Sequence, residues 1–123
     1  MSRSRASAKD AGRKFNADIA RALHDHIDDV IEVRNRNGSK DRGDIAGLRH
    51  LGRRVVVECK NWTTMQLAQW AHEAEIERGH DDALVGVVAH KRHGRGDPLE
   101  QWITMTVRDF IALLTGERPE DPS

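Results

Sequence analysis

The chain has 123 residues, of which 37% are hydrophobic and 33% charged, and its 20 basic residues balance its 20 acidic ones. This length predicts a single domain over residues 1–123, with flexible ends at 1–8 and 117–123. Zero net charge argues against a uniformly basic nucleic-acid binder, although local basic patches still act on a ligand. One cysteine excludes an internal disulfide and a multi-thiolate zinc site. The single cysteine fits a reducing bacterial cytoplasm. No membrane partner is expected, because no stretch is long and apolar enough to span a bilayer.

Apolar periodicity predicts eight elements along the chain. They are a helix at about 8–26, a strand at 30–34, a strand-like segment around Asp44, a strand at 54–60, a helix at about 64–78 ended by Gly79, a buried strand at 83–89, an edge strand at 101–105 and a last helix capped by Thr106. A helix between two strands implies a parallel pair. The predicted fold class is therefore α/β (mixed α+β), with a central mixed sheet flanked by helices.

Two of these helices carry patterns that predict their orientation. In the last helix, Val107, Phe110, Ile111 and Leu114 recur at helical spacing and form an apolar stripe that ends before Gly116. In the helix at 64–78, Leu67, Trp70, Ala71 and Ala74 form the expected packed stripe, whereas Glu73, Glu75 and Glu77 are expected to form a solvated acidic face.

Charged residues gather around the strand at 54–60. Strand side chains alternate between faces, so Val56, Glu58 and Lys60 share one face and Val55, Val57 and Cys59 the other. A turn containing Gly47 and Gly52 would bring Asp44 next to Glu58, because opposed residues on paired strands have Cβ atoms about 5 Å apart. Two carboxylates and one lysine then converge. The alternative is a solvated Glu–Lys pair at a strand end.

This set suits phosphodiester hydrolysis. A few hard oxygen ligands leave Mg²⁺ with several waters, one of which can attack phosphorus, and Mn²⁺ is expected to substitute. The lysine can orient or deprotonate that water and offset charge in the transition state. Asp44 and Glu58-Cys59-Lys60 resemble the D…(D/E)-x-K signature of the PD-(D/E)XK nucleases, in particular the small Holliday junction resolvases of archaea and of actinobacterial phages.

The resemblance implies a restriction-endonuclease-like αβββαβ core and a role for each matching residue. Asp44 and Glu58 would hold the metal ion, with the backbone carbonyl of Cys59 as a further ligand, and Lys60 would activate or position the water. Asn16 stands where the family often has a glutamate in its first helix, and a buried amide without a catalytic part is the alternative. Gln66 or Gln69, in the helix after the strand, would assist the site; solvated helix glutamines are the alternative.

Basic residues that would contact the DNA backbone occur in four clusters. They are Arg13 and Lys14 near the start, Lys40 and Arg42 before Asp44, Arg49 and Arg53 at the hairpin turn, and His90, Lys91, Arg92 and Arg95 after the buried strand. Each is otherwise a solvated charge.

The interpretation that unites these features is a Mg²⁺-dependent endonuclease of branched DNA, most simply a Holliday junction resolvase, which by resemblance would act as a homodimer. Two alternatives stay open: a DNA-binding module of nuclease fold that does not cut, and a repair or restriction-type nuclease of linear duplex. The sequence leaves open the DNA sequence preference, the number of metal ions, the dimer surface, and whether the source is a phage or a cell.

Overall fold

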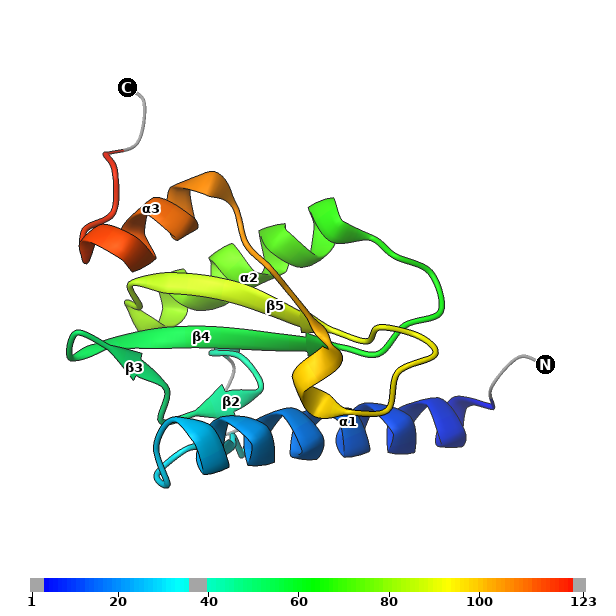
Figure 1. Cartoon of the computed structure of the whole chain (residues 1–123). Helices are drawn as coiled ribbons and strands as arrows, with labels where there is room; N and C mark the ends of the chain where they lie inside the picture. The colour runs from blue at the N-terminus through cyan, green and yellow to red at the C-terminus, as the bar shows by residue number, and fades with distance from the viewer. Residues whose placement is uncertain (1–3, 36–39, 121–123) are drawn as a thin grey trace.

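The computed structural model describes residues 4–35 and 40–120 (Figure 1). Its elements are α1 (Arg5–His26), β1 (Glu32–Val33), β2 (Ile45–Ala46), β3 (Arg49–His50), β4 (Arg53–Lys60), α2 (Leu67–Asp81), β5 (Val85–His90), the 3-10 helix η1 (Pro98–Glu100), β6 (Trp102–Thr104) and α3 (Val107–Thr115). Within the described residues, no helix has both the length and the apolar character needed to cross a membrane.

The main sheet has four strands in the order β3-β4-β5-β6. β4 and β5 are parallel, with Glu58 opposite Val88, and the other neighbours pair antiparallel. α2 is the crossover between the two parallel strands, and β1 and β2 form a separate antiparallel pair. The predicted mixed sheet flanked by helices is confirmed.

The two faces of β4 meet different helices. Val55, Val57 and Cys59 join the core cluster that contains Phe15 and Ile19 of α1. The opposite face, which carries Glu58 and Lys60, packs against α2, where Trp70 and Ala74 form a second cluster with Val88. The predicted alternation is therefore confirmed, and it puts both charged residues on the α2 side.

Side-chain hydrogen bonds hold both ends of the described chain in place. α1 begins at Arg5 because the Ser4 hydroxyl caps it by accepting a hydrogen bond from the Ser7 N–H at 3.1 Å. Near the other end, Arg118 donates to the Leu84 carbonyl at 2.8 Å and to Asp109 at 2.9 Å. The outermost parts of the ends expected to be flexible, residues 1–3 and 121–123, lie outside the described residues.

α2 and α3 differ from the expectations in informative ways. α2 continues through Gly79 to Asp81, because Asp82 supplies the left-handed cap at φ 48°. Thr106 caps α3 as expected, by accepting from the Asp109 N–H. The apolar stripe of α3 does not pack into the core: Val107 is 75% exposed and Leu114 68% exposed.

The Asp109 side chain explains this rotation of α3. It accepts a hydrogen bond from the Gly86 N–H at 2.9 Å and pairs with Arg118. This anchor turns Asp109 and Ala112 toward the sheet, so the apolar stripe of α3 faces outward.

Gly43 lets the loop before β2 lie directly on β4. It has φ 93°, and a Cβ at this position would come within 2.9 Å of Val56 Cγ1 and 3.0 Å of the Val57 carbonyl oxygen. Both the backbone conformation and the space therefore favour glycine. The next residue is Asp44, so this contact fixes where its carboxylate sits.

We predict that Gly43→Ala destabilises the protein more than Gly52→Ala. Both glycines have positive φ, but a Cβ at Gly52 meets nothing within 4 Å. Left-handed strain alone costs about 1–2 kcal/mol, and the clash at Gly43 adds to it. Urea unfolding of both variants measures the difference, and equal losses would contradict the proposed close contact.

Candidate functional site

A cleft of about 680 Å³ opens at the edge of the sheet, beside the end of β4. Its wall brings together α1, the loop before β2, and the end of β4 with the residues that follow it. Asn16, Asp44 and Glu58 all line it. The other lining residues are Ala8, Lys9, Gly12, Cys59, Asn61, Trp62 and Thr63. With Cys59 included, the structure thus places four of the sequence-predicted site residues in one cavity.

Asp44 reaches this cleft by a different local route from the expected hairpin. Gly47 separates β2 from β3, and β2 pairs with β1 instead of β4. Asp44 nevertheless docks on β4, where its N–H donates to the Val57 carbonyl at 2.8 Å and its Oδ2 accepts from the Cys59 N–H at 2.7 Å. Its carboxylate is therefore held beside Glu58 by the backbone of the strand.

Glu58 is buried, with 7% of its surface exposed. Burial is the main cause that raises the pKa of its carboxyl, and the neighbouring Asp44 and Glu77 carboxyls raise that pKa further. Without a cation the site therefore favours a protonated Glu58. A bound cation would reverse that preference.

Lys60 lies on the same face of β4 as Glu58, but its partner is on α2. Its Nζ is 2.6 Å from Glu73 Oε2 and lies 5.4 Å from the centre of the Trp62 ring. Burial lowers the pKa of Lys60, whereas the Glu73 hydrogen bond and the charges of Glu58, Glu73 and Glu77 raise it, and the net shift is upward. Lys60 is therefore a cation at neutral pH.

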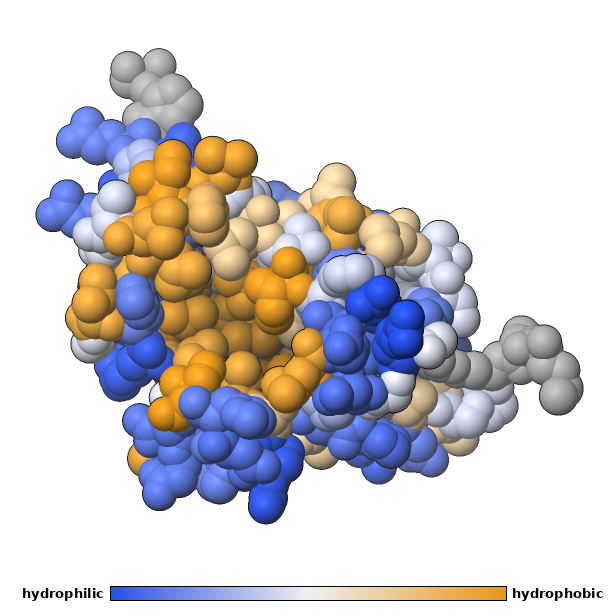
Figure 2. Space-filling view, in the orientation of Figure 1, coloured by the Kyte–Doolittle hydropathy of each residue, from blue (hydrophilic) through white to orange (hydrophobic). Residues whose placement is uncertain are grey.

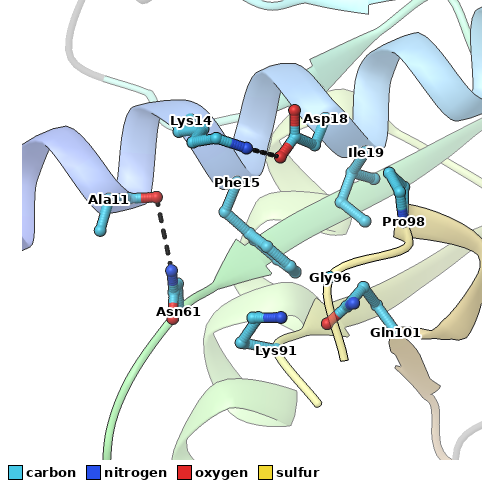
Figure 3. Close-up of a pocket in the computed structure, with 10 residues that line it drawn as sticks. All are labelled: Ala11, Lys14, Phe15, Asp18, Ile19, Asn61, Lys91, Gly96, Pro98 and Gln101. Atoms are coloured by element: carbon cyan, nitrogen blue, oxygen red, sulfur yellow. Dashed lines mark hydrogen bonds and ion pairs between the residues drawn. The ribbon is translucent and has the colours of Figure 1, made fainter. Parts of the chain in front are cut away.

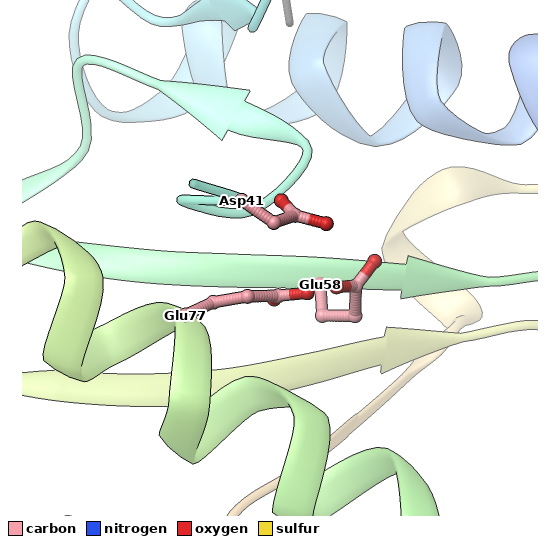
Figure 4. Close-up of side chains that lie close together, drawn as sticks. All are labelled: Asp41, Glu58 and Glu77. Carbon is pink, nitrogen blue, oxygen red and sulfur yellow. The ribbon is translucent and has the colours of Figure 1, made fainter. Parts of the chain in front are cut away.

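Of the three acidic residues of α2 that the sequence predicts to be solvated, only Glu75 is exposed. Glu73 pairs with Lys60, and Glu77 is only 5% exposed. Figure 4 shows Glu77, Glu58 and Asp41 pointing toward one another, and an oxygen of each lies within 4.8 Å of the others. Glu77 lies seven residues after Trp70 and therefore on the same inward face of α2. This spacing is the sequence signal that could have predicted the burial of Glu77.

The remaining predicted catalytic and metal-binding residues have clear positions. Gln69 is exposed and donates to Glu73 Oε1 at 3.3 Å, so it reaches Lys60 only through Glu73. Gln66 precedes the first turn of α2 without a side-chain cap. The Cys59 thiol packs in the apolar core on the α1 side, and burial raises its pKa, so a nucleophilic thiolate is disfavoured.

Two of the predicted phosphate contacts share a small pocket next to the cleft (Figure 3). Lys14 and Lys91 line this pocket of about 160 Å³, together with Asn61, which also lines the acidic cleft. Lys14 is paired with Asp18 at 2.6 Å, and the Lys91 ammonium donates to the carbonyls of Arg92 and Arg95.

Lys40 and Arg42 border the acidic residues from the other side. With Arg34 they line a pocket of about 230 Å³ that also contains Asp41 and Asp44. Cationic side chains from four parts of the chain thus line the two pockets that adjoin the acidic cleft.

Other predicted DNA contacts do not gather there. Arg49 and Arg53 lie at the opposite end of β4, and Arg53 is about 16 Å along the strand from Glu58. Arg13 is exposed and pairs with Asp10, whereas Arg92 stacks on Trp102, 4.5 Å from the ring centre, and Arg95 is exposed.

His90 is the one predicted contact whose side chain cannot reach a ligand in this structure. It is 3% exposed, its Nε2 lies 2.7 Å from Thr104 Oγ1, and its ring packs on Trp70. Because β5 is covered on both faces, its last residue is part of the core. The predicted DNA contact of His90 is therefore wrong.

Comparisons with models of protein families, with curated proteins and with solved structures return no match to this chain. The donors of the site are carboxylate oxygens, which suit hard divalent cations such as Mg²⁺ and Mn²⁺. Glu77 Oε2 is buried and has no hydrogen-bond partner in the described chain, so the residues present fit such an ion.

We predict that the metal-free protein loses stability as the pH rises. The folded state raises the pKa of Glu58 above its ordinary value of 4.5. Above that pH the unfolded chain releases a proton that the folded state keeps, so the free energy of unfolding falls by up to about 1.4 kcal/mol per pH unit for one proton. Urea unfolding in EDTA between about pH 5 and 8 measures this slope.

Glu58→Gln should flatten that slope, since glutamine does not titrate. Glu75→Gln is the matched control, because Glu75 is an exposed carboxylate of α2 that pairs with Arg78. If Glu58→Gln kept the wild-type slope, the buried Glu58 carboxyl would not be its source.

Proposed function

We propose that this protein is a divalent-metal-dependent endonuclease that hydrolyses phosphodiester bonds of branched DNA, with Mg²⁺ as the cofactor and Mn²⁺ as a substitute. One observation carries the proposal: Asp44 and Glu58 line the same cleft, and Lys60 shares the face of β4 on which Glu58 lies. The resemblance of these residues to the PD-(D/E)XK signature supports the same reaction, and the junction preference rests on that resemblance.

Each residue of the site has a distinct part in this proposal. Asp44 and Glu58 hold the ion, and the Cys59 carbonyl is a further candidate ligand. The ion supplies Lewis-acid stabilisation of the phosphate when it is bound. Lys60 is a cation, so it orients the attacking water and offsets negative charge in the transition state rather than removing a proton.

The surroundings of the cleft support a polyanionic substrate. Lys14 and Lys91 line a pocket on one side, and Lys40, Arg42 and Arg34 line one on the other. These side chains would contact phosphates and give affinity without reading the sequence. Although the chain has zero net charge, these five cations lie beside the cleft along which the backbone of DNA would pass.

An exposed apolar surface supports a homodimer. We call it the α3 apolar face: Val107, Phe110, Ile111 and Leu114 of α3, with Ile103 of β6, all at least 41% exposed. Figure 2 shows an orange area that extends from α3 across the front of the molecule. Patches of this kind mark protein interfaces, and a second copy is the partner that would place two active sites on two DNA strands.

We expect Lys60→Ala and Glu58→Ala each to reduce cleavage by at least about 100-fold while junction binding is largely retained, because both residues act on the reaction and the flanking cations act on affinity. Cleavage of a labelled four-way junction, a fork and a linear duplex is measured with Mg²⁺ at one salt concentration. Glu75→Gln should cut like wild type.

The outcomes separate the candidate functions. Undiminished cutting by either alanine variant would rule out this site. Junction binding by the wild type without any Mg²⁺-dependent nicking would favour the non-catalytic binding module, and a preference for linear duplex would favour a repair or restriction-type nuclease.

We also predict that Phe110→Asp converts a dimer into a monomer, because a charge at the centre of the α3 apolar face would be buried in the interface. Sedimentation equilibrium measures the mass. Ile27→Asp is the control, since Ile27 is an equally exposed apolar residue outside that face. A wild-type protein that is monomeric, or a Phe110→Asp protein that stays dimeric, would exclude this interface.

A further inference from the structure

Three carboxylates from different parts of the chain meet beside the cleft. Asp41 comes from the loop before β2, Glu58 from β4 and Glu77 from α2 (Figure 4). One oxygen of each lies within 4.8 Å of the others. The ligands of one octahedral ion are about 3 to 4 Å apart, given metal–oxygen distances near 2.1 Å. The spacing therefore suits a shared cation after small side-chain adjustments.

The Glu77 carboxylate gives an independent sign of a missing ligand. Glu77 is 5% exposed, and its Oε2 is buried without a hydrogen-bond partner in the described chain. Leaving such an acceptor unsatisfied is costly. The nearest cations in sequence pair with other carboxylates: Lys60, two residues after Glu58, pairs with Glu73, and Arg78, directly after Glu77, pairs with Glu75.

We propose that Asp41, Glu58 and Glu77 form a second divalent-cation subsite, adjacent to the one held by Asp44 and Glu58, with Glu58 as the shared ligand. The inference deepens the proposed function and rests on it for the first subsite. Two ions that share a carboxylate lie about 3.5–4 Å apart in phosphodiester-cleaving sites. The second ion would be Mg²⁺ or Mn²⁺, because all three donors are hard oxygens.

The backbone holds these three residues in place. Asp41 Oδ1 accepts from the Gly43 N–H at 2.9 Å, and Gly43 itself lies against β4. α2 lies close to β5 because position 86 is glycine: a Cβ there would be 2.7 Å from the Ala74 carbonyl oxygen. The subsite therefore takes its extra carboxylate from α2, whereas the residues that α1 contributes to the cleft, Asn16 among them, include no carboxylate.

Counting bound Mn²⁺ tests this subsite directly. Equilibrium dialysis of the full chain gives the stoichiometry, and electron paramagnetic resonance reports whether two ions are close enough to couple. We expect two coupled ions in the wild type, and only one in Glu77→Gln, with the second affinity lowered at least about tenfold. Glu75→Gln, which alters an exposed carboxylate of the same helix, should keep both ions.

Thermal unfolding provides a second readout. An ion that binds only the folded chain raises the melting temperature, so saturating Mn²⁺ should stabilise wild type more than Glu77→Gln. If Glu77→Gln does not fold, Asp41→Asn takes its place, since asparagine keeps the oxygen that accepts from Gly43. One ion in the wild type, or two coupled ions in Glu77→Gln, would overturn the proposal.

Failure of the subsite and failure of the nuclease function give different results. A protein that binds one ion and still cuts DNA in a Mg²⁺-dependent manner refutes only the second subsite. A protein that binds two coupled ions, loses one in Glu77→Gln and cuts no DNA retains the subsite and refutes the nuclease.

Discussion

The hydrogen bond from the Cys59 N–H to Asp44 Oδ2 is the contact on which the site depends. β3 begins only at Arg49, opposite Arg54, so it leaves the edge of β4 from Val55 onward unpaired, and the segment that carries Asp44 occupies that edge. The backbone bond from Asp44 to Val57 and the close approach of Gly43 fix the loop there. A sheet edge that would otherwise be open to another strand thus becomes the place where a carboxylate is held next to Glu58.

The buried charges near Asp44 determine which ligand this site would stabilise. Burial and neighbouring carboxylates raise the pKa values of Glu58 and Glu77, which is the arrangement that a divalent cation would stabilise. Lys60 does not neutralise this group, because Glu73 holds its ammonium at 2.6 Å. The resulting site keeps its cationic side chain charged and its carboxylates close together, and both properties suit the proposed chemistry on a phosphodiester.

A second buried carboxylate organises the opposite end of the sheet. Asp109 accepts from the Gly86 N–H and pairs with Arg118, which sets the rotation of α3 and leaves its apolar stripe outside. The same glycine allows α2 to approach β5 and so positions Glu77. Position 86 therefore links the proposed dimer surface to the proposed second metal subsite.

Because alternation along a strand and capping at Thr106 are local properties of the chain, the sequence by itself determined all three helices, the parallel strands β4 and β5 and the faces of β4, but not β3 or η1. It also singled out Asp44, Glu58 and Lys60. Only the tertiary structure decided that Glu77 is buried, that His90 belongs to the core and that the α3 stripe is exposed. The burial of Glu77 and the exposure of the α3 stripe depend on how each helix is rotated about its axis, and the burial of His90 depends on which elements cover β5. Residues far away in sequence, Gly86 and Asp109 among them, set that geometry.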